Sequence, residues 1–103
     1  MTVGYFTKQN RETFFISADF EDVLEDGETI VVGNSSVVAE DVNGEVVTDD
    51  VLTAGSIAVS GYTLKIKVKE GSEALSPYKI TFVAVTSLTN TWEKDVEMEI
   101  IEY

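Results

Sequence analysis

Two stretches near the C-terminus decide the fold: YKITFVAV at residues 78–85 and TWEKDVEMEI at residues 91–100. The first stretch is apolar on both faces apart from one lysine and one threonine, as expected of a central strand with a neighbour on each side. A short polar segment, residues 87–90, joins the two stretches as a turn. Together they predict a β-hairpin that forms the scaffold of the core.

The second stretch alternates between apolar and acidic side chains, which is the pattern of a half-buried strand. Its apolar face is predicted to consist of Trp92, Val96, Met98 and Ile100, with Trp92 as the largest single contributor to the core. The opposite face carries four carboxylates, here called the acidic ladder: Glu93, Asp95, Glu97 and Glu99. This ladder is either the solvated face of an outer strand, where it would also resist unwanted strand pairing, or a docking surface for a basic partner.

The rest of the chain consists of short valine-rich stretches separated by turn residues, and no helical stripe lasts more than about two turns. Residues 12–18 and the lysine-alternating residues 63–69 are clear strands. Asn43-Gly44 predicts a tight hairpin turn, and one short helical turn is expected within residues 19–28. Seven or eight short strands with these turn signals predict an all-β fold, an immunoglobulin-like two-sheet β-sandwich.

A chain of 103 residues has the length of one domain. Residues 12–103 are predicted to form the sandwich, and residues 1–11 a flexible N-terminal arm. The first residues lack the charged leader and the apolar run of a signal peptide, and no apolar run approaches the length of a membrane span. We therefore expect the protein to fold in the cytosol.

Acidic residues dominate the charge, with 19 Asp and Glu against 7 Lys and Arg, for a formal net charge of −12. Such a field repels phosphate backbones and anionic lipid headgroups, so neither nucleic acid nor a membrane is an expected partner. The chain has no cysteine and no histidine. This composition excludes disulfides, thiolate zinc sites and every mechanism that needs an imidazole, and we expect a protein that is not an enzyme and needs no cofactor.

The acidic segment at residues 19–28 raises a calcium hypothesis, because hard cations take several carboxylate oxygens from one loop. The spacing does not fit. With Asp22 as the first ligand, Leu24 and Gly33 fall where oxygen ligands are required. We interpret the segment as a solvated acidic loop and expect no metal site.

Tyr78 follows a turn and opens a strand. This is the position of the corner tyrosine of immunoglobulin-like domains, whose hydroxyl forms a hydrogen bond to the backbone across the preceding loop. The alternative is an ordinary buried tyrosine.

Several short motifs follow one another in a recognisable order. They are an Asp-aromatic pair after a strand, a leucine, a Gly-acid-Thr-Ile step, a glycine-containing loop that leads to a tyrosine, and a Thr-Ser turn. In this chain the motifs are Ala18-Asp19-Phe20, Leu24, Gly27-Glu28-Thr29-Ile30, residues 71–78 and Thr86-Ser87. The order resembles that of the immunoglobulin-like fibre-to-tail adaptor proteins of bacteriophages and prophages. The likeness covers about residues 6–101, with Phe20 where that family has a tryptophan.

This resemblance implies a non-enzymatic virion structural protein, either a tail-fibre adaptor or a tail or neck assembly module. It implies partners among other virion and tail proteins, or further copies of the chain in a ring with a head-to-tail interface. It also implies a bacterial host cytoplasm as the place of assembly, followed by incorporation into the virion.

The candidate partner surface combines the N-terminal arm with the acidic ladder. Its predicted members are the arm residues Val3, Tyr5 and Phe6, together with Glu93, Asp95, Glu97 and Glu99. We hypothesise that the arm becomes ordered against a neighbouring molecule by strand addition. The alternative function is an adhesion or carbohydrate-binding sandwich that stacks sugars on Trp92, Tyr62 or Tyr5.

Overall fold

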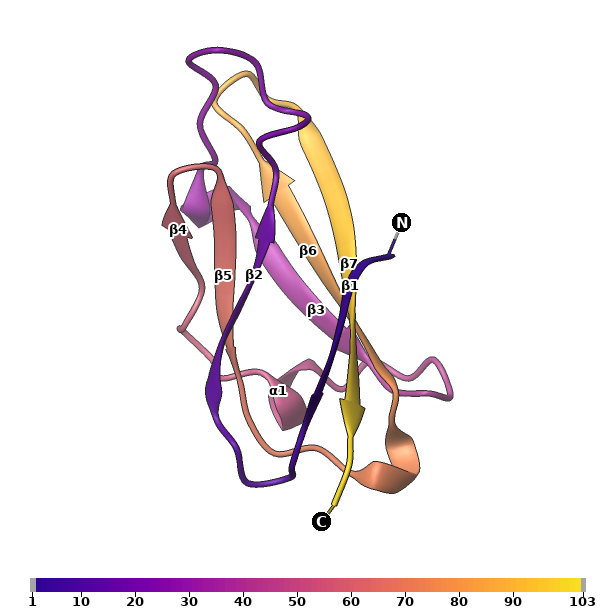
Figure 1. Ribbon diagram of the computed structural model, residues 1–103. Helices are drawn as coiled ribbons and strands as arrows, with labels where there is room; N and C mark the ends of the chain where they lie inside the picture. The colour runs from indigo at the N-terminus through magenta and orange to yellow at the C-terminus, as the bar shows by residue number, and fades with distance from the viewer. Residues whose placement is uncertain (1, 103) are drawn as a thin grey trace.

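The computed structural model describes residues 2–102 and contains two packed β-sheets (Figure 1). The four-stranded sheet has the order β1 (Thr2–Lys8), β7 (Thr91–Ile100), β6 (Tyr78–Val85), β3 (Ser36–Glu40). The three-stranded sheet has the order β2 (Phe14–Asp19), β5 (Thr63–Val68), β4 (Ala58–Ser60). Between residues 2 and 102, helical structure is confined to the short segments η1 (Val32–Asn34), α1 (Thr48–Val51) and η2 (Glu73–Leu75). The predicted immunoglobulin-like two-sheet sandwich is confirmed.

The hairpin predicted from residues 78–100 lies at the centre of the larger sheet. Strands β6 and β7 pair antiparallel along their whole shared length, from Tyr78 opposite Met98 to Val85 opposite Thr91. The turn between them closes through a hydrogen bond from the Thr86 N–H to the Asn90 carbonyl, 2.9 Å long. Because β7 also pairs with β1, both strands of the hairpin have a neighbour on each side.

The two turns predicted earlier in the chain are also present. In the first turn, Gly44 has a φ of +83°. The Asp41 carboxylate accepts hydrogen bonds from the N–H groups of Asn43 and Glu45, the two neighbours of Gly44. In the acidic segment, the Phe20 carbonyl accepts hydrogen bonds from two N–H groups of the following turn. That segment therefore folds back over the end of the sandwich and buries the Phe20 side chain completely.

The N-terminal segment differs from the prediction. Residues 2–8 form β1, which pairs in parallel with β7 between Asp95 and Ile100. The prediction of a flexible arm over residues 1–11 is therefore wrong for residues 2–8, and the sandwich does not begin at residue 12. Met1, like Tyr103 at the other end, lies outside the described residues. The strand escapes recognition because its inward face includes Gly4 and Lys8, which do not complete an apolar stripe.

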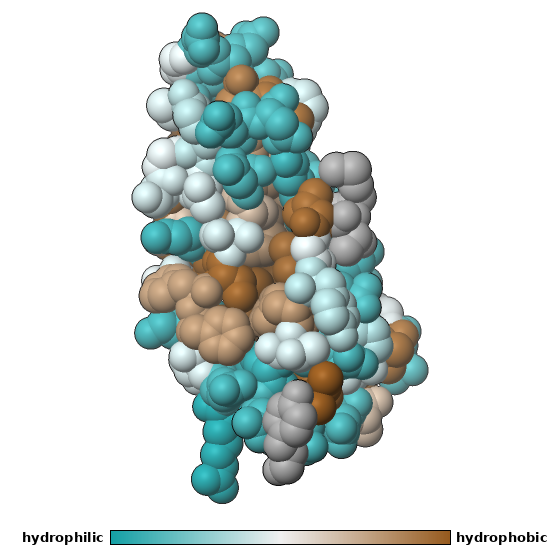
Figure 2. All heavy atoms as spheres, in the orientation of Figure 1, coloured by the Kyte–Doolittle hydropathy of each residue, from teal (hydrophilic) through white to brown (hydrophobic). Residues whose placement is uncertain are grey.

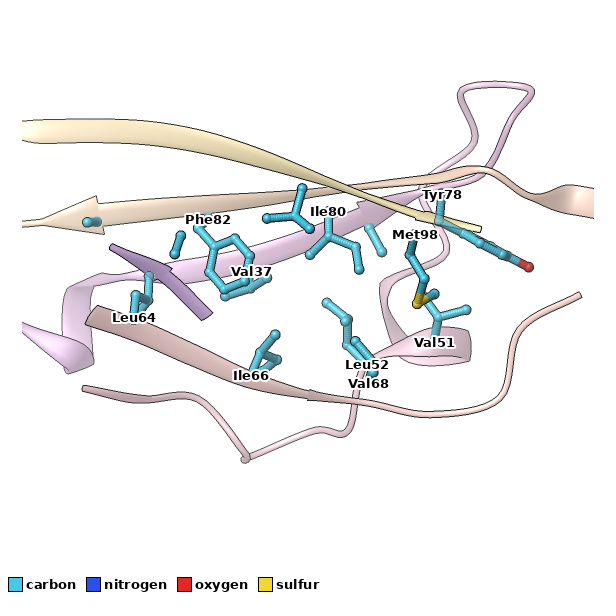
Figure 3. Close-up of a cluster of buried hydrophobic side chains, with 14 of the residues drawn as sticks. Val37, Val51, Leu52, Leu64, Ile66, Val68, Tyr78, Ile80, Phe82 and Met98 are labelled. Carbon is cyan, nitrogen blue, oxygen red and sulfur yellow. The ribbon is translucent and has the colours of Figure 1, made fainter. Parts of the chain in front are cut away.

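The core fills the space between the sheets (Figure 3). Side chains of β6 point toward those of β5, while Val51 and Leu52 close one end of the core below Met98. The completely buried members include Phe20, Ala39, Val51, Leu64, Val68, Ile80, Phe82, Ala84 and Met98. Replacing a buried aromatic such as Phe82 with alanine in a core of this kind costs roughly 3–5 kcal/mol of stability.

The inward face of β7 follows the prediction at three of its four apolar positions. Val96, Met98 and Ile100 are buried, but Trp92 is 36% exposed. The prediction of a buried Trp92 is wrong because β7 begins beyond the end of β2, as Figure 1 shows. Lys94, the next inward residue along β7, already lies level with Asp19 at the end of β2.

The corner tyrosine is confirmed. The Tyr78 side chain is buried, and its hydroxyl oxygen accepts a hydrogen bond of 2.8 Å from the Ser72 N–H. Gly71 makes this corner possible, because its φ is +114° and a Cβ placed there would lie 2.8 Å from Cδ1 of Ile100. The loop before β6 is therefore fixed by one side-chain hydrogen bond and by one position that only glycine fits.

We predict that Tyr78→Phe lowers the free energy of unfolding by about 1–2 kcal/mol, because the Ser72 N–H loses its acceptor. Urea denaturation at neutral pH measures the change. The matched control is Tyr62→Phe, since Tyr62 is an exposed residue of the β4–β5 turn. Equal losses in the two variants would contradict a stabilising role of the corner hydroxyl.

Candidate functional site

The outer face of the four-stranded sheet collects most of the predicted partner surface. Strand β1 runs beside β7, with Tyr5 next to Glu97 and Thr7 next to Glu99. The Tyr5 side chain is exposed on the same face as the acidic ladder. Val3 lies at a bulge between Thr2 and Gly4 and lines the hollow between β1 and β2 instead. The predicted surface residues other than Val3 and Phe6 therefore lie together, and we call Tyr5, Glu93, Asp95, Glu97 and Glu99 the acidic face.

Phe6 does not belong to the acidic face. Its ring points inward and meets the Phe14 ring edge to face, with the centroids 5.8 Å apart. The reason is the period of two along a strand, which places neighbouring residues such as Tyr5 and Phe6 on opposite sides. The interpretation of Phe6 as a surface residue depended on a flexible arm and is wrong in a paired strand.

The acidic ladder lies on a central strand, so it does not protect a sheet edge. Glu93 is exposed, and the other three carboxylates are half-buried between the side chains of β1 and β6. The Tyr5 hydroxyl donates a hydrogen bond to the Glu99 carboxylate. Lys79 lies opposite Glu97 in register, but its ammonium forms an ion pair with Glu40 at 3.6 Å.

The lysines of β5 belong to the opposite surface of the sandwich. Lys65 and Lys67 lie on the outer side of the three-stranded sheet, and the Lys67 ammonium is 5.2 Å from the centre of the Phe15 ring. Lys69 follows the same strand. We call these three residues the lysine face. Because they are on the other sheet, they do not neutralise the acidic ladder.

Lys94 joins the two sheets at one end of the molecule. It is buried, and its ammonium donates hydrogen bonds to the Asp19 carbonyl, at 2.8 Å, and to the Asp22 carboxylate. The same ammonium lies 5.5 Å from the centre of the Phe20 ring. The hydrogen bond from Lys94 lowers the pKa of Asp22 below its ordinary value. One carboxylate of the acidic segment thus has a structural role that the sequence pattern did not indicate.

Glu28 is a second member of the acidic segment with a structural role. Its buried carboxylate accepts hydrogen bonds from the Glu25 N–H at 2.9 Å, the Thr86 hydroxyl, and the Asn90 amide at 3.1 Å. The hydrogen bond from Thr86, followed by that from Glu25, lowers the pKa of Glu28. The carboxylate therefore fastens the acidic segment to the β6–β7 turn.

Lys8 fastens the opposite end of the sandwich. Its buried ammonium donates hydrogen bonds to three backbone carbonyls, those of Gln9, Asn10 and Glu70. Burial lowers the pKa of Lys8 below its ordinary value. These contacts tie the end of β1 to the loop that precedes the corner tyrosine.

The acidic segment does not form a calcium loop. Among residues 2–102, no group of three or more Asp and Glu side chains is arranged so that it could hold a metal ion. The buried Glu28 carboxylate of this segment instead accepts hydrogen bonds from the protein itself.

Comparison with protein-family models and with curated proteins gave no match for this chain. Within the described part of the chain, no helix is long and apolar enough to cross a membrane. The class that the structure defines is a small two-sheet β-sandwich with an acidic outer face on its larger sheet.

We predict that Glu28 makes stability depend on pH in the acidic range. Its pKa is lower in the folded protein, so the unfolded chain binds more protons and stability falls as the pH drops below the ordinary glutamate value of 4.5. The difference in unfolding free energy between wild type and Glu28→Gln should be largest near pH 7 and should shrink toward pH 3. Glu21→Gln, at an exposed position, controls for the loss of one charge. A difference that does not change with pH would contradict the assignment.

Proposed function

We propose that the protein is a non-enzymatic binding module of a bacteriophage or prophage virion, acting as a tail-fibre adaptor or as a tail or neck assembly module. Its partners are other virion or tail proteins or further copies of the same chain, met in the bacterial host cytoplasm and retained in the virion. The observation that carries the proposal is the acidic face, on which the exposed Tyr5 ring lies beside four carboxylates. Such a surface favours contact with a protein of opposite charge.

The phage assignment is supported by the order of the motifs in the sequence. In the folded chain, those motifs lie at joints of the sandwich. Phe20 is completely buried, Glu28 fastens a turn, and Tyr78 forms the corner. The motifs therefore support a shared architecture, while the partner contacts are argued from the surface.

Strand β1 changes how the N-terminal segment takes part. Because residues 2–8 already pair with β7 of their own chain, they contribute the outward side chain of Tyr5 rather than a free strand. The contact is thus made by a sheet face and needs no ordering of a flexible arm.

The two outer faces of the sandwich have opposite charge. The acidic face lies on the larger sheet and the lysine face on the smaller one. Packing the acidic face of one copy on the lysine face of the next gives a heterologous, head-to-tail contact, which generates a ring or a string. The net charge of −12 opposes such an assembly at long range, so the attraction must come from close contact.

The test compares two charge-neutralised variants by light scattering and negative-stain imaging over a range of protein concentrations. The ladder variant is Glu93→Gln, Asp95→Asn, Glu97→Gln and Glu99→Gln, and the lysine variant is Lys65→Gln, Lys67→Gln and Lys69→Gln. We expect wild type to form rings or strings. Each variant should associate more weakly than wild type by roughly tenfold or more. A mixture of the two variants should form dimers, because one complementary pair of faces is still intact.

The control for the ladder variant changes four exposed acids in loops and α1: Glu21→Gln, Asp26→Asn, Glu45→Gln and Asp49→Asn. This control should assemble like wild type or more readily. It removes as many negative charges as the ladder variant does, but it leaves the acidic face unchanged. Wild type that stays monomeric at every concentration, or equal effects of the two acidic sets, would contradict the self-assembly part of the proposal.

A carbohydrate-binding or adhesion module is the second candidate, because the three rings named for sugar stacking are all exposed. Trp92 is 36%, Tyr62 40% and Tyr5 59% exposed. This candidate predicts that the fluorescence of Trp92, the single tryptophan, changes saturably when neutral oligosaccharides are added. The assembly proposal predicts no change with sugars at millimolar concentration.

A further inference from the structure

The two sheets differ in width, and this difference leaves a groove. The larger sheet continues through β1, whereas the smaller sheet ends at β2. No strand of the smaller sheet therefore lies opposite β1 in the described part of the chain. A groove of about 610 Å³ lies there between β1 and β2. Figure 2 shows apolar side chains gathered in the hollow between these two strands.

The walls of this groove are mainly apolar. Gly4 and Phe6 line it from β1, Phe14 and Ile16 line it from β2, and Val96 of β7 lies at its base. The contact between the Phe6 and Phe14 rings closes one end. At Gly4 a Cβ would meet only Val96, at 3.8 Å, so the missing side chain keeps the groove open without any backbone strain.

One edge of the groove carries unpaired backbone groups. The Phe20 N–H donates a hydrogen bond to the Tyr62 carbonyl, and the antiparallel register then assigns the even-numbered residues of β2 to the ladder with β5. The N–H and C=O groups of Phe15 and Ser17 therefore point away from β5, into the groove. The Asp19 carbonyl points the same way and is bound by Lys94. Within residues 2–102, no hydrogen bond engages these outward groups of Phe15 and Ser17.

We propose that this groove binds one extended segment of a partner protein, which adds to β2 as the fourth strand of the smaller sheet. Strand addition satisfies the free backbone groups, and alternate side chains of the segment fill the apolar groove. The proposal concerns a different surface from the acidic face and does not depend on the proposed function.

The shape of the groove selects a single segment over a second folded copy. The empty strand position is covered on one side by β1 of the larger sheet. In a second copy, β2 would be covered in the same way by its own larger sheet, and that sheet would collide with β1. Only a strand without such a covering layer fits into the groove.

The chemistry of the segment is indicated by the strand that β2 already accepts on its other edge. In β5, Leu64, Ile66 and Val68 point into the core and alternate with lysines on the outside. On the free edge of β2, the exposed Phe15 ring and the Asp19 carboxylate would lie beside the outward side chains of an added strand. An aromatic ring, a carboxylate and a net charge of −12 all favour cations, so the partner segment alternates apolar and basic residues.

The test uses a fluorescently labelled peptide that copies residues 63–69, Thr-Leu-Lys-Ile-Lys-Val-Lys, and measures its anisotropy with the intact protein. The control peptide has the same composition with its lysines grouped together, so charge is kept and alternation is lost. We expect saturable binding of the first peptide, and binding of the control that is weaker by roughly tenfold or more.

Two pairs of protein variants locate the binding. Ser17→Pro removes an outward N–H that does not pair with β5, and it should weaken binding by roughly fivefold or more relative to Ser17→Ala. Gly4→Leu fills the groove and should abolish binding, whereas Gly33→Leu, at a position with nothing within 4 Å, should not. Thermal unfolding followed by circular dichroism verifies that each variant is folded.

No binding to wild type, equal binding of the two peptides, or equal binding to Gly4→Leu and Gly33→Leu would each overturn the proposal. If Ser17→Pro fails to fold, the Gly4 and Gly33 pair still decides the location.

Discussion

The two-sided pairing of β7 is the constraint on which the rest of the structure depends. Its backbone forms an antiparallel ladder with β6 on one edge and a parallel ladder with β1 on the other. This pairing holds the inward residues Val96, Met98 and Ile100 against the smaller sheet and turns the acidic ladder outward. It also makes the larger sheet one strand wider than its partner, which produces the groove beside β2. The acidic face and the groove thus have one common cause.

Three buried charges hold the ends of this arrangement. Lys94 and Glu28 connect the acidic segment to β7 and to the β6–β7 turn, and Lys8 connects β1 to the loop before β6. A buried charge is tolerated only where hydrogen bonds replace the water that it loses, and each of these groups has at least two partners. Some charged residues that the sequence pattern assigns to the surface are therefore buried and stabilise the fold.

Much of the fold could be predicted from the sequence because the signal was local. Alternation over residues 78–100 identified the central hairpin, and a tyrosine after a turn identified the corner. Two local predictions failed for reasons of context. Trp92 has the right position in the alternating pattern, but that pattern does not reveal where the facing sheet ends. Strand β1 has Gly4 and Lys8 among its inward residues, so its pairing depends on β7 rather than on its own apolar face.

The candidate site was predictable in part for the same reason. The acidic ladder follows from the period of one strand, but its neighbour Tyr5 comes from the opposite end of the chain, and only the sheet order brings the two together. Lys94 offered a signal that could have been used, since a lysine at an inward position implies a buried partner. The groove has no sequence signal, because it arises from a difference between the numbers of strands in two sheets.

The parallel pairing of β1 with β7 has a mechanical consequence. In parallel strands at the two ends of a chain, the start of one and the end of the other lie toward opposite ends of the ladder. A pull on the two termini therefore acts along the strand axes and loads the hydrogen bonds between β1 and β7 together, in shear. An antiparallel terminal pair pulled from adjacent ends would open one bond at a time. Tension along the 44 Å long axis of the sandwich is thus resisted by all the hydrogen bonds of this ladder at once.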